Sequence, residues 1–256
     1  MKKVKRDDIV KFCDEYLEAD TFKDYCKNGL QLEGKEEVGK VIVGVSLSEK
    51  FIKAALNKNP DMLAVHHGLF ANQFGDPPRI RSFLRNRLKL MLKNDLNLLG
   101  YHLPLDAHPK IGNNINLIRK LGLKKKCRIE TERYGEIGFV GSLKSEMTFS
   151  EFVEYVNEKL DTTAFAIQGG KDKVQNIGII SGGASNNYLD AMWAGADTYL
   201  CGAIEENVVR ELEETGMNFI NAGHYNTERY GIQNLGELIE NKFNIAVEYI
   251  DIPNEV

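Results

Sequence analysis

The sequence predicts an α/β fold built from two similar, pseudo-symmetric α/β halves. Two observations predict it. Short runs of buried-strand type alternate with segments of helical apolar spacing, and the order of these segments in the first half returns in the second. Because strand–helix–strand order joins parallel strands, each half is expected to contain parallel strands.

Apolar spacing and turn residues define the expected elements of the first half. In chain order they are a helix over 7–17, a strand over 41–45, a helix ending at 56, a strand over 62–65, a basic helix over 79–93 and a strand over 96–101. The second half opens with a strand over 139–143 and a helix that begins at the capping box Thr148–Glu151. Its further elements are strands over 164–168 and 177–181, a helix over 187–194, a strand over 198–201, a helix over 205–214 and a strand over 218–222.

The repeat is clearest where a strand is followed by His-x-x-x-carboxylate. Leu98–His102 precedes Asp106, and Ile220–His224 precedes Glu228. Strand–helix units resemble one another in many proteins, but the repeated polar pair favours a duplicated architecture. We place the halves at 1–125, with His66, His67 and Asp106, and at 126–256, with His224 and Glu228, the C-terminal segment being free to pack back onto the first half.

Composition is that of an ordinary globular protein, with 43% hydrophobic and 27% charged residues and a net charge of −4 over 256 residues. No run of 18 apolar residues occurs and the basic start has no apolar core, so we expect a cytoplasmic protein without membrane contact. The cysteines form no CxxC pair, which argues against a thiolate zinc site and predicts reduced structural residues at Cys13, Cys26, Cys127 and Cys201.

All five histidines follow predicted strands: His66, His67, His102, His108 and His224. Ligands of open parallel sheets bind beyond the carboxyl ends of the strands, so these segments are expected to converge in a cleft between the halves. Adjacent side chains at a strand end point to opposite sides, which lets His66 and His67 reach two cations about 3.5–4 Å apart. Imidazole with carboxylate and no thiolate suits Fe, Zn, Mn, Ni or Co, without selecting one.

Two of the histidines have open roles. His102 is either a direct metal ligand or a residue that orients one. His108, just before Pro109, is either a loop residue or a second such group.

At these residues the sequence resembles the Nif-three-like family, also called the GTP cyclohydrolase I type 2 family. The matching motifs are Asn28–Gln31, Ala64–Phe70, Tyr101–His108, Ile180–Ala184 and Ala222–Glu228. The resemblance implies a homohexamer of ring or cage form, two similar halves and a dinuclear metal centre held by His66, His67, Asp106, His224 and Glu228. The chain departs from the family at Gly68, where proline is usual, and it lacks the domain that some members insert between the halves.

Two divalent ions lower the pKa of a water that they share and hold substrate oxygens, so we expect metal-dependent hydrolysis. The expected substrate is a nucleotide or another phosphorylated compound, and GTP cyclohydrolase-like attack on a purine is one form. No catalytic residue is assigned beyond the metal-bound water. The turn Ser181–Ser185 either holds a phosphate on its N–H groups or is only a tight connection between strand and helix.

An alternative function is DNA binding. The basic helix carries Arg79, Arg81, Arg85, Arg87, Lys89 and Lys93, of which Arg81, Arg85, Lys89 and Lys93 form a cationic stripe opposite the apolar set Ile80, Phe83, Leu84, Leu88 and Met91. A solvated helix face explains the stripe equally well. Repeated over a hexamer, it would bind single- and double-stranded DNA without sequence specificity. A third hypothesis is a scaffold whose metal stabilises the assembly.

Overall fold

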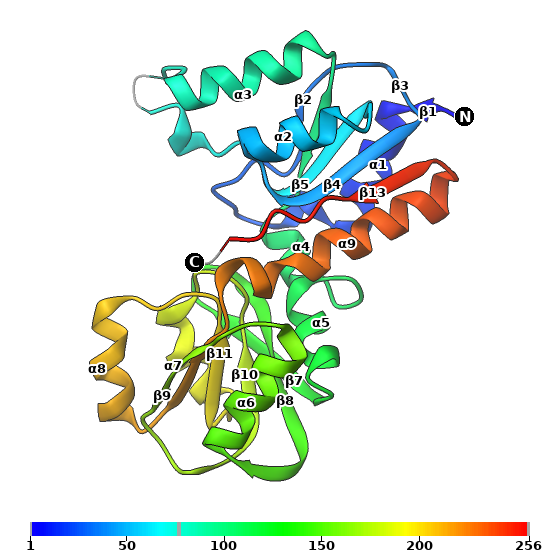
Figure 1. Ribbon diagram of the computed structural model, residues 1–256. Coiled ribbons are helices and arrows are strands. Elements are labelled where there is room, and N and C mark those ends of the chain that lie inside the picture. Colours follow the sequence, from blue (N-terminus) through cyan, green and yellow to red (C-terminus); the bar gives the residue numbers. More distant parts are fainter. Residues whose placement is uncertain (1, 76–77, 255–256) are drawn as a thin grey trace. The chain divides into compact units, whose positions relative to one another are not determined.

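The structure, a computed structural model, describes residues 2–75 and 78–254, and the chain forms a mixed α/β protein. It folds as two compact units, each built around its own sheet (Figure 1). The first unit extends to Leu105 and regains Gly231–Ile252, and the second comprises Asp106–Tyr230 with Pro253 and Asn254.

The sheet of the first unit has five strands in the order β13-β4-β5-β6-β2. Its strands are β13 (Ala246–Tyr249), β4 (Lys40–Ser46), β5 (Met62–His67), β6 (Asn97–Gly100) and β2 (Gly29–Leu32). The first four are parallel, and β2 pairs antiparallel with β6. A separate antiparallel pair joins β1 (Val4–Lys5) and β3 (Glu37–Val38).

Alternation along β4 assigns the helices of this unit to two faces. Ile42 belongs to a buried cluster with α2 (Glu49–Leu56) and α3 (Ser82–Lys93), whereas Val43 lies against Gly236 of α9 (His224–Phe243). Gly44 faces α2, and a Cβ there would overlap the Phe51 ring. Since side chains of a strand alternate between faces, the two helix layers follow from this pattern. The remaining elements here are α1 (Arg6–Leu17) and the short helices η1 (Ala19–Thr21) and η2 (Ala71–Gln73).

The sheet of the second unit has six strands in the order β7-β8-β10-β11-β12-β9. They are β7 (Lys124–Thr131), β8 (Gly135–Thr148), β10 (Lys173–Ile179), β11 (Thr198–Cys201), β12 (Asn218–Asn221) and β9 (Phe165–Gln168). Only β10, β11 and β12 are mutually parallel. The other pairings are antiparallel.

Two helix layers also cover this sheet. Ile177 and Ile179 pack with α5 (Asn113–Lys120) and α6 (Phe149–Leu160), and α6 begins at the predicted capping box of Thr148 and Glu151. Gly178 faces the other way, where a Cβ would lie 2.7 Å from that of Ala191 in α7 (Tyr188–Trp193). The remaining helices are α8 (Glu206–Thr215), α4 (Leu103–Ala107) and η3 (Ser185–Asn187).

The predicted repeat is visible in the strands of each unit. Three parallel strands, β4-β5-β6 in one and β10-β11-β12 in the other, are flanked by an antiparallel strand, β2 or β9, that comes earlier in the chain than its partner. The units differ on the opposite side of these three strands, where β13 is parallel to β4 but β8 is antiparallel to β10.

Matching hydrogen bonds support the duplication more strongly than the strand order does. Asp61, before β5, accepts from the N–H groups of Gly39 and Lys40, and Asp197, before β11, accepts from those of Gln175 and Asn176. Burial opposes the ionisation of Asp61, but bonds from Lys35 and these N–H groups outweigh it and lower its pKa.

Two buried asparagines continue the match. The Asn97 amide accepts from Gly34 N (2.8 Å) and donates to Lys35 O (2.8 Å). The Asn218 amide accepts from Gly170 N (2.9 Å) and donates to Lys171 O (2.8 Å). Each side chain therefore fixes the Gly-Lys loop that follows the antiparallel edge strand.

The division of the chain differs from the expected one at residue 125. The first unit ends at Leu105 because α5 packs on β8 and β10 of the second sheet. The last strand, β13, pairs with β4, so the C-terminal segment supplies an edge of the first sheet.

The basic helix is shorter than predicted, and its apolar set is only partly correct. It begins at Ser82, because Arg81 is extended (φ −74°, ψ 168°), so Arg79, Ile80 and Arg81 precede it. Leu84 and Met91 are buried and Leu88 packs against the same cluster. Ile80 and Phe83 are exposed, which contradicts their place on the buried face.

The four cysteines Cys13, Cys26, Cys127 and Cys201 are free thiols. In residues 2–75 and 78–254, no helix has the length and hydropathy that a bilayer span requires. Burial raises the pKa of Cys26 and Cys201 to about 12, so both thiols are protonated and structural at neutral pH.

The duplicated asparagines can be tested by substitution. Asn97→Ala and Asn218→Ala each remove the partner of an N–H and of a carbonyl in a partly buried loop, so we expect each to lower the free energy of unfolding by about 1–2 kcal/mol. Urea denaturation followed by circular dichroism measures the change. Asn207→Ala, on the exposed surface of α8, is the matched control and should alter it by less than about 0.5 kcal/mol. Equal losses for all three variants would contradict the structural role of the pair.

Candidate functional site

Three histidine side chains meet in the first unit. His66 and His67 end β5, and His102 follows β6, the neighbouring parallel strand. One ring nitrogen of each lies within 4.8 Å of the others, and the His66 and His67 ring centroids are 4.5 Å apart. The predicted convergence of strand ends is therefore correct for the two strands of this unit, and His102 belongs to the resulting cluster.

Each of these rings is held through its Nδ1 atom. His66 Nδ1 lies 2.9 Å from the carbonyl oxygen of Tyr101, which can only accept, so the proton resides on Nδ1. His67 Nδ1 lies 2.9 Å from the Ser46 hydroxyl. At His66 this arrangement leaves Nε2 as the atom with which a neutral imidazole can bind a metal. The Ser46 hydroxyl can donate or accept, so at His67 it holds the ring in place, and Nε2 coordinates a metal when the proton is on Nδ1.

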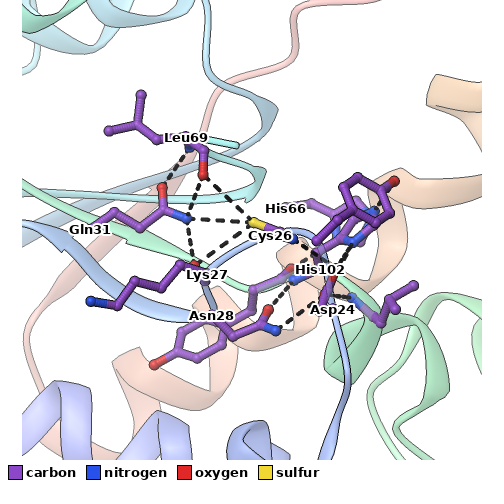
Figure 2. Close-up of polar contacts among 11 residues, drawn as sticks. Asp24, Cys26, Lys27, Asn28, Gln31, His66, Leu69 and His102 are labelled. Atoms are coloured by element: carbon purple, nitrogen blue, oxygen red, sulfur yellow. Dashed lines mark hydrogen bonds and ion pairs between the residues drawn. The ribbon is translucent and has the colours of Figure 1, made fainter. Parts of the chain in front are cut away.

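His102 is held by a buried carboxylate that the sequence did not reveal. Asp24, with a side chain about 1% exposed, lies 3.0 Å from His102 Nδ1 through Oδ1 (Figure 2). Asp24 also accepts from the N–H groups of Cys26 and Leu103 and from the Asn28 amide. Burial disfavours the carboxylate, but these bonds and His102 outweigh it and lower the Asp24 pKa.

The motif Asn28–Gln31 supports the same cluster. Asn28 Oδ1 accepts from the N–H of His102 (2.8 Å), and Gln31 Oε1 accepts from that of Leu69 (2.6 Å; Figure 2). A Cβ at Gly68 would overlap Gln31 Oε1. The glycine that stands in place of the family's proline is therefore packed directly against the Gln31 amide.

Aromatic rings surround the cluster. The Tyr25 hydroxyl lies 3.3 Å from His102 Nε2, and its ring stacks on Phe70 at 5.6 Å between centroids. Phe70 in turn lies 6.0 Å from the His67 ring. A ligand that approaches these histidines meets apolar ring surfaces beside the nitrogen atoms.

The second unit brings its three predicted ligands to one turn. Asp106 is 4% and Glu228 3% exposed. Asp106 Oδ1 accepts from the Ser181 hydroxyl (2.9 Å) and from Asn113 (2.8 Å). His224 Nε2 lies 3.1 Å from Glu228 Oε2, one turn further along α9.

Gly182, beside Ser181, completes that arrangement. Its φ is +69°, and a Cβ there would overlap Glu228 Oε1 and lie 3.1 Å from His224 Nε2. Only glycine fits, because a side chain would fill the space at both donor atoms. The turn thus contacts Asp106 through Ser181 and the other two ligands through Gly182.

This turn uses its own N–H groups within the unit. Ser181 N donates to Asn114, Gly182 N to Thr227 and Ala184 N to Gly182 O. Of the two open interpretations, these bonds favour a tight strand-to-helix turn over a phosphate cradle.

The other predicted residues lie elsewhere in the fold. His108 Nδ1 accepts from the N–H groups of Lys110 and Ile111, which assigns it to its loop. The stripe residues Arg81, Arg85, Lys89 and Lys93 are exposed on or just before α3. Their DNA binding stays a prediction.

Comparisons with known proteins agree with this arrangement. A family model described as Duf34/NIF3 (NGG1p interacting factor 3) matches residues 4–255. A GTP cyclohydrolase 1 type 2 homolog of Pseudomonas aeruginosa is 39% identical over 246 residues, covering 96% of each chain, and one of Escherichia coli K12 is 35% identical over 98% of this chain and 99% of that one.

Solved structures give the same result. The protein ybgI, of unknown function, superposes with a TM-score of 0.93 at 35% identity, covering 99% of this chain and 100% of that one. Reduced HcgD from Methanocaldococcus jannaschii superposes with a TM-score of 0.83 at 25% identity, covering 98% and 100%.

The contact between Asp24 and His102 predicts which ring nitrogen carries the proton. We expect nitrogen NMR of the metal-free protein to show His102 protonated on Nδ1, and Asp24→Asn to abolish that preference because an amide is a weaker acceptor. Asp20→Asn, an exposed carboxylate of the neighbouring short helix, should leave the tautomer unchanged. An Nε2-protonated ring in the unsubstituted protein would contradict the assignment.

Proposed function

Because the chain belongs to the Duf34/NIF3 family, we propose that it is a metal-dependent hydrolase acting on a nucleotide or another phosphorylated compound. Two divalent cations per chain would be held by His66, His67, Asp106, His224 and Glu228. The names of the curated relatives make GTP cyclohydrolase-like chemistry one form of the proposal.

The observation that carries the proposal is the way in which the three imidazoles of the first unit are oriented. Each Nδ1 atom is engaged by an oxygen, from Tyr101, Ser46 or Asp24, and the ring nitrogens of the three side chains cluster within 4.8 Å. Metal-binding histidines in proteins show this pattern, because a hydrogen bond at one nitrogen fixes the tautomer that coordinates through the other.

The second unit supplies the charge that such a site needs. Asp106 and Glu228 are buried carboxylates, and burial of carboxylates is favoured next to cations. Ser181 and Asn113 orient Asp106 through neutral donors, so they fix its position without neutralising it. Gly182 keeps the space beside Glu228 and His224 clear of a side chain.

Bound divalent cations would supply Lewis acidity toward water and phosphate oxygens. The residues of this chain provide the orientation: Asp24 and Tyr101 fix two rings, and Ser181 fixes a carboxylate. Tyr25 and Phe70 place aromatic rings beside His102 and His67.

The experiment is metal analysis paired with a substrate panel. Protein reconstituted with Zn, Mn or Fe is expected to hold about two ions per chain and to turn over a nucleotide or phosphoester. His67→Ala and Glu228→Ala should each remove bound metal and lower turnover at least about 100-fold. His108→Asn, a histidine change in a loop, is the matched control and should keep both.

Two results would overturn the proposal. The first is a reconstituted protein that holds no metal under anaerobic conditions. The second is turnover that survives in the His67→Ala, Glu228→Ala double variant, because the activity would then come from another site.

A further inference from the structure

The second unit contains an open pocket of about 740 Å³ at the carboxyl end of its parallel strands. Its lining includes Gly202 after β11 and Asn221 and Gly223 at the end of β12. Ligands of parallel sheets bind at this edge, and the volume lies within the range of small-molecule sites. No predicted metal ligand lines this pocket.

An exposed aromatic ring stands at the pocket beside an amide. Phe165 begins the edge strand β9 and is 52% exposed, although it is large and apolar. Its cross-strand partner is Asn221, so the two side chains share one face of the sheet. An aromatic surface and an amide side by side can bind the face and the edge of a flat heterocycle.

The polar groups of the pocket are fixed before any ligand arrives. Asn221 Oδ1 accepts from the N–H of Gly223 (3.0 Å), so the side chain offers its Nδ2 donors to a ligand. Asn226 donates to Thr162 (3.0 Å), whose hydroxyl donates to the Ala222 carbonyl (3.0 Å). Asp161 adds a carboxylate acceptor to the lining.

The pocket also adjoins the segment that carries the second unit's proposed ligands. Gly223 and Asn226 flank His224 in sequence, and a Cβ at Gly202 would lie 2.7 Å from the His224 Cα atom. A compound bound here therefore lies next to the start of α9. This position suits the part of a substrate that is recognised rather than cleaved.

We propose that this pocket binds a planar nitrogen heterocycle of purine size, stacked on Phe165 and hydrogen-bonded at its edge by Asn221. The proposal rests on the proposed function, since it assigns the ring of the nucleotide to a place on the second unit. Stacking on an aromatic side chain with polar contacts at the ring edge is a common mode of base recognition.

The test measures binding alone, on protein stripped of metal. Isothermal titration calorimetry with guanosine and adenosine is expected to show binding of at least one of them to the unsubstituted protein. Phe165→Ala should weaken it roughly tenfold, and Phe165→Tyr should stay within about twofold, because a tyrosine ring still stacks. Trp193→Ala removes an aromatic ring that is 73% exposed outside the pocket and should change nothing.

Phe165→Leu guards against a folding defect, because it keeps the apolar volume of the edge strand but not the flat ring. We expect it to bind as weakly as Phe165→Ala while its thermal unfolding midpoint stays within a few degrees of that of the unsubstituted protein.

The inference is overturned by equal affinity in the Phe165→Ala and unsubstituted proteins, or by the absence of binding of either nucleoside at millimolar concentration. Ribose 5-phosphate that binds as tightly as guanosine, with no dependence on Phe165, would also overturn it. Since neither metal nor turnover is measured, failure here is distinguishable from failure of the hydrolase proposal.

Discussion

The anchoring of the histidine Nδ1 atoms is the constraint on which the rest of the account depends. An imidazole offers one lone pair when neutral, and the partner of the other nitrogen decides where that lone pair is. In the first unit the partners are the Tyr101 carbonyl, the Ser46 hydroxyl and the Asp24 carboxylate. These three contacts come from three parts of the fold: Ser46 ends β4, Tyr101 follows β6, and Asp24 precedes β2. All three parts must be correctly placed for the contacts to form.

The duplicated framework explains why the two units carry different donors on similar scaffolds. Asp61 and Asp197, like Asn97 and Asn218, make matching bonds at the amino ends of equivalent strands. The carboxyl ends have diverged: β5 ends in two histidines, whereas β11 is followed by Gly202, and carboxylates dominate the donors of the second unit. The matching end fixes the loops of each sheet, and the end that differs holds the candidate metal ligands.

Much of this could be predicted from the sequence, because strand ends are marked by local pattern. Apolar runs and the His-x-x-x-carboxylate repeat pointed to His66 and His67, which end a strand, and to Asp106, His224 and Glu228, which lie in helices that follow strands. Asp24 could not be found in this way, since it lies in an irregular segment and reaches His102 only through the fold. The boundary predicted at 125 differs from the observed one because α5 packs on the second sheet. The exposure of Phe165 depends on its place at the sheet edge, which the local apolar pattern of its strand does not reveal.

X-ray absorption spectroscopy of the zinc-reconstituted protein tests the central claim most directly. The account predicts nitrogen and oxygen neighbours with the multiple scattering of imidazole, and a second zinc about 3.5–4 Å away. A sulfur neighbour near about 2.3 Å would contradict it, because the protonated Cys26 and Cys201 thiols are given no part in binding. Zinc surrounded only by oxygen would contradict it as well.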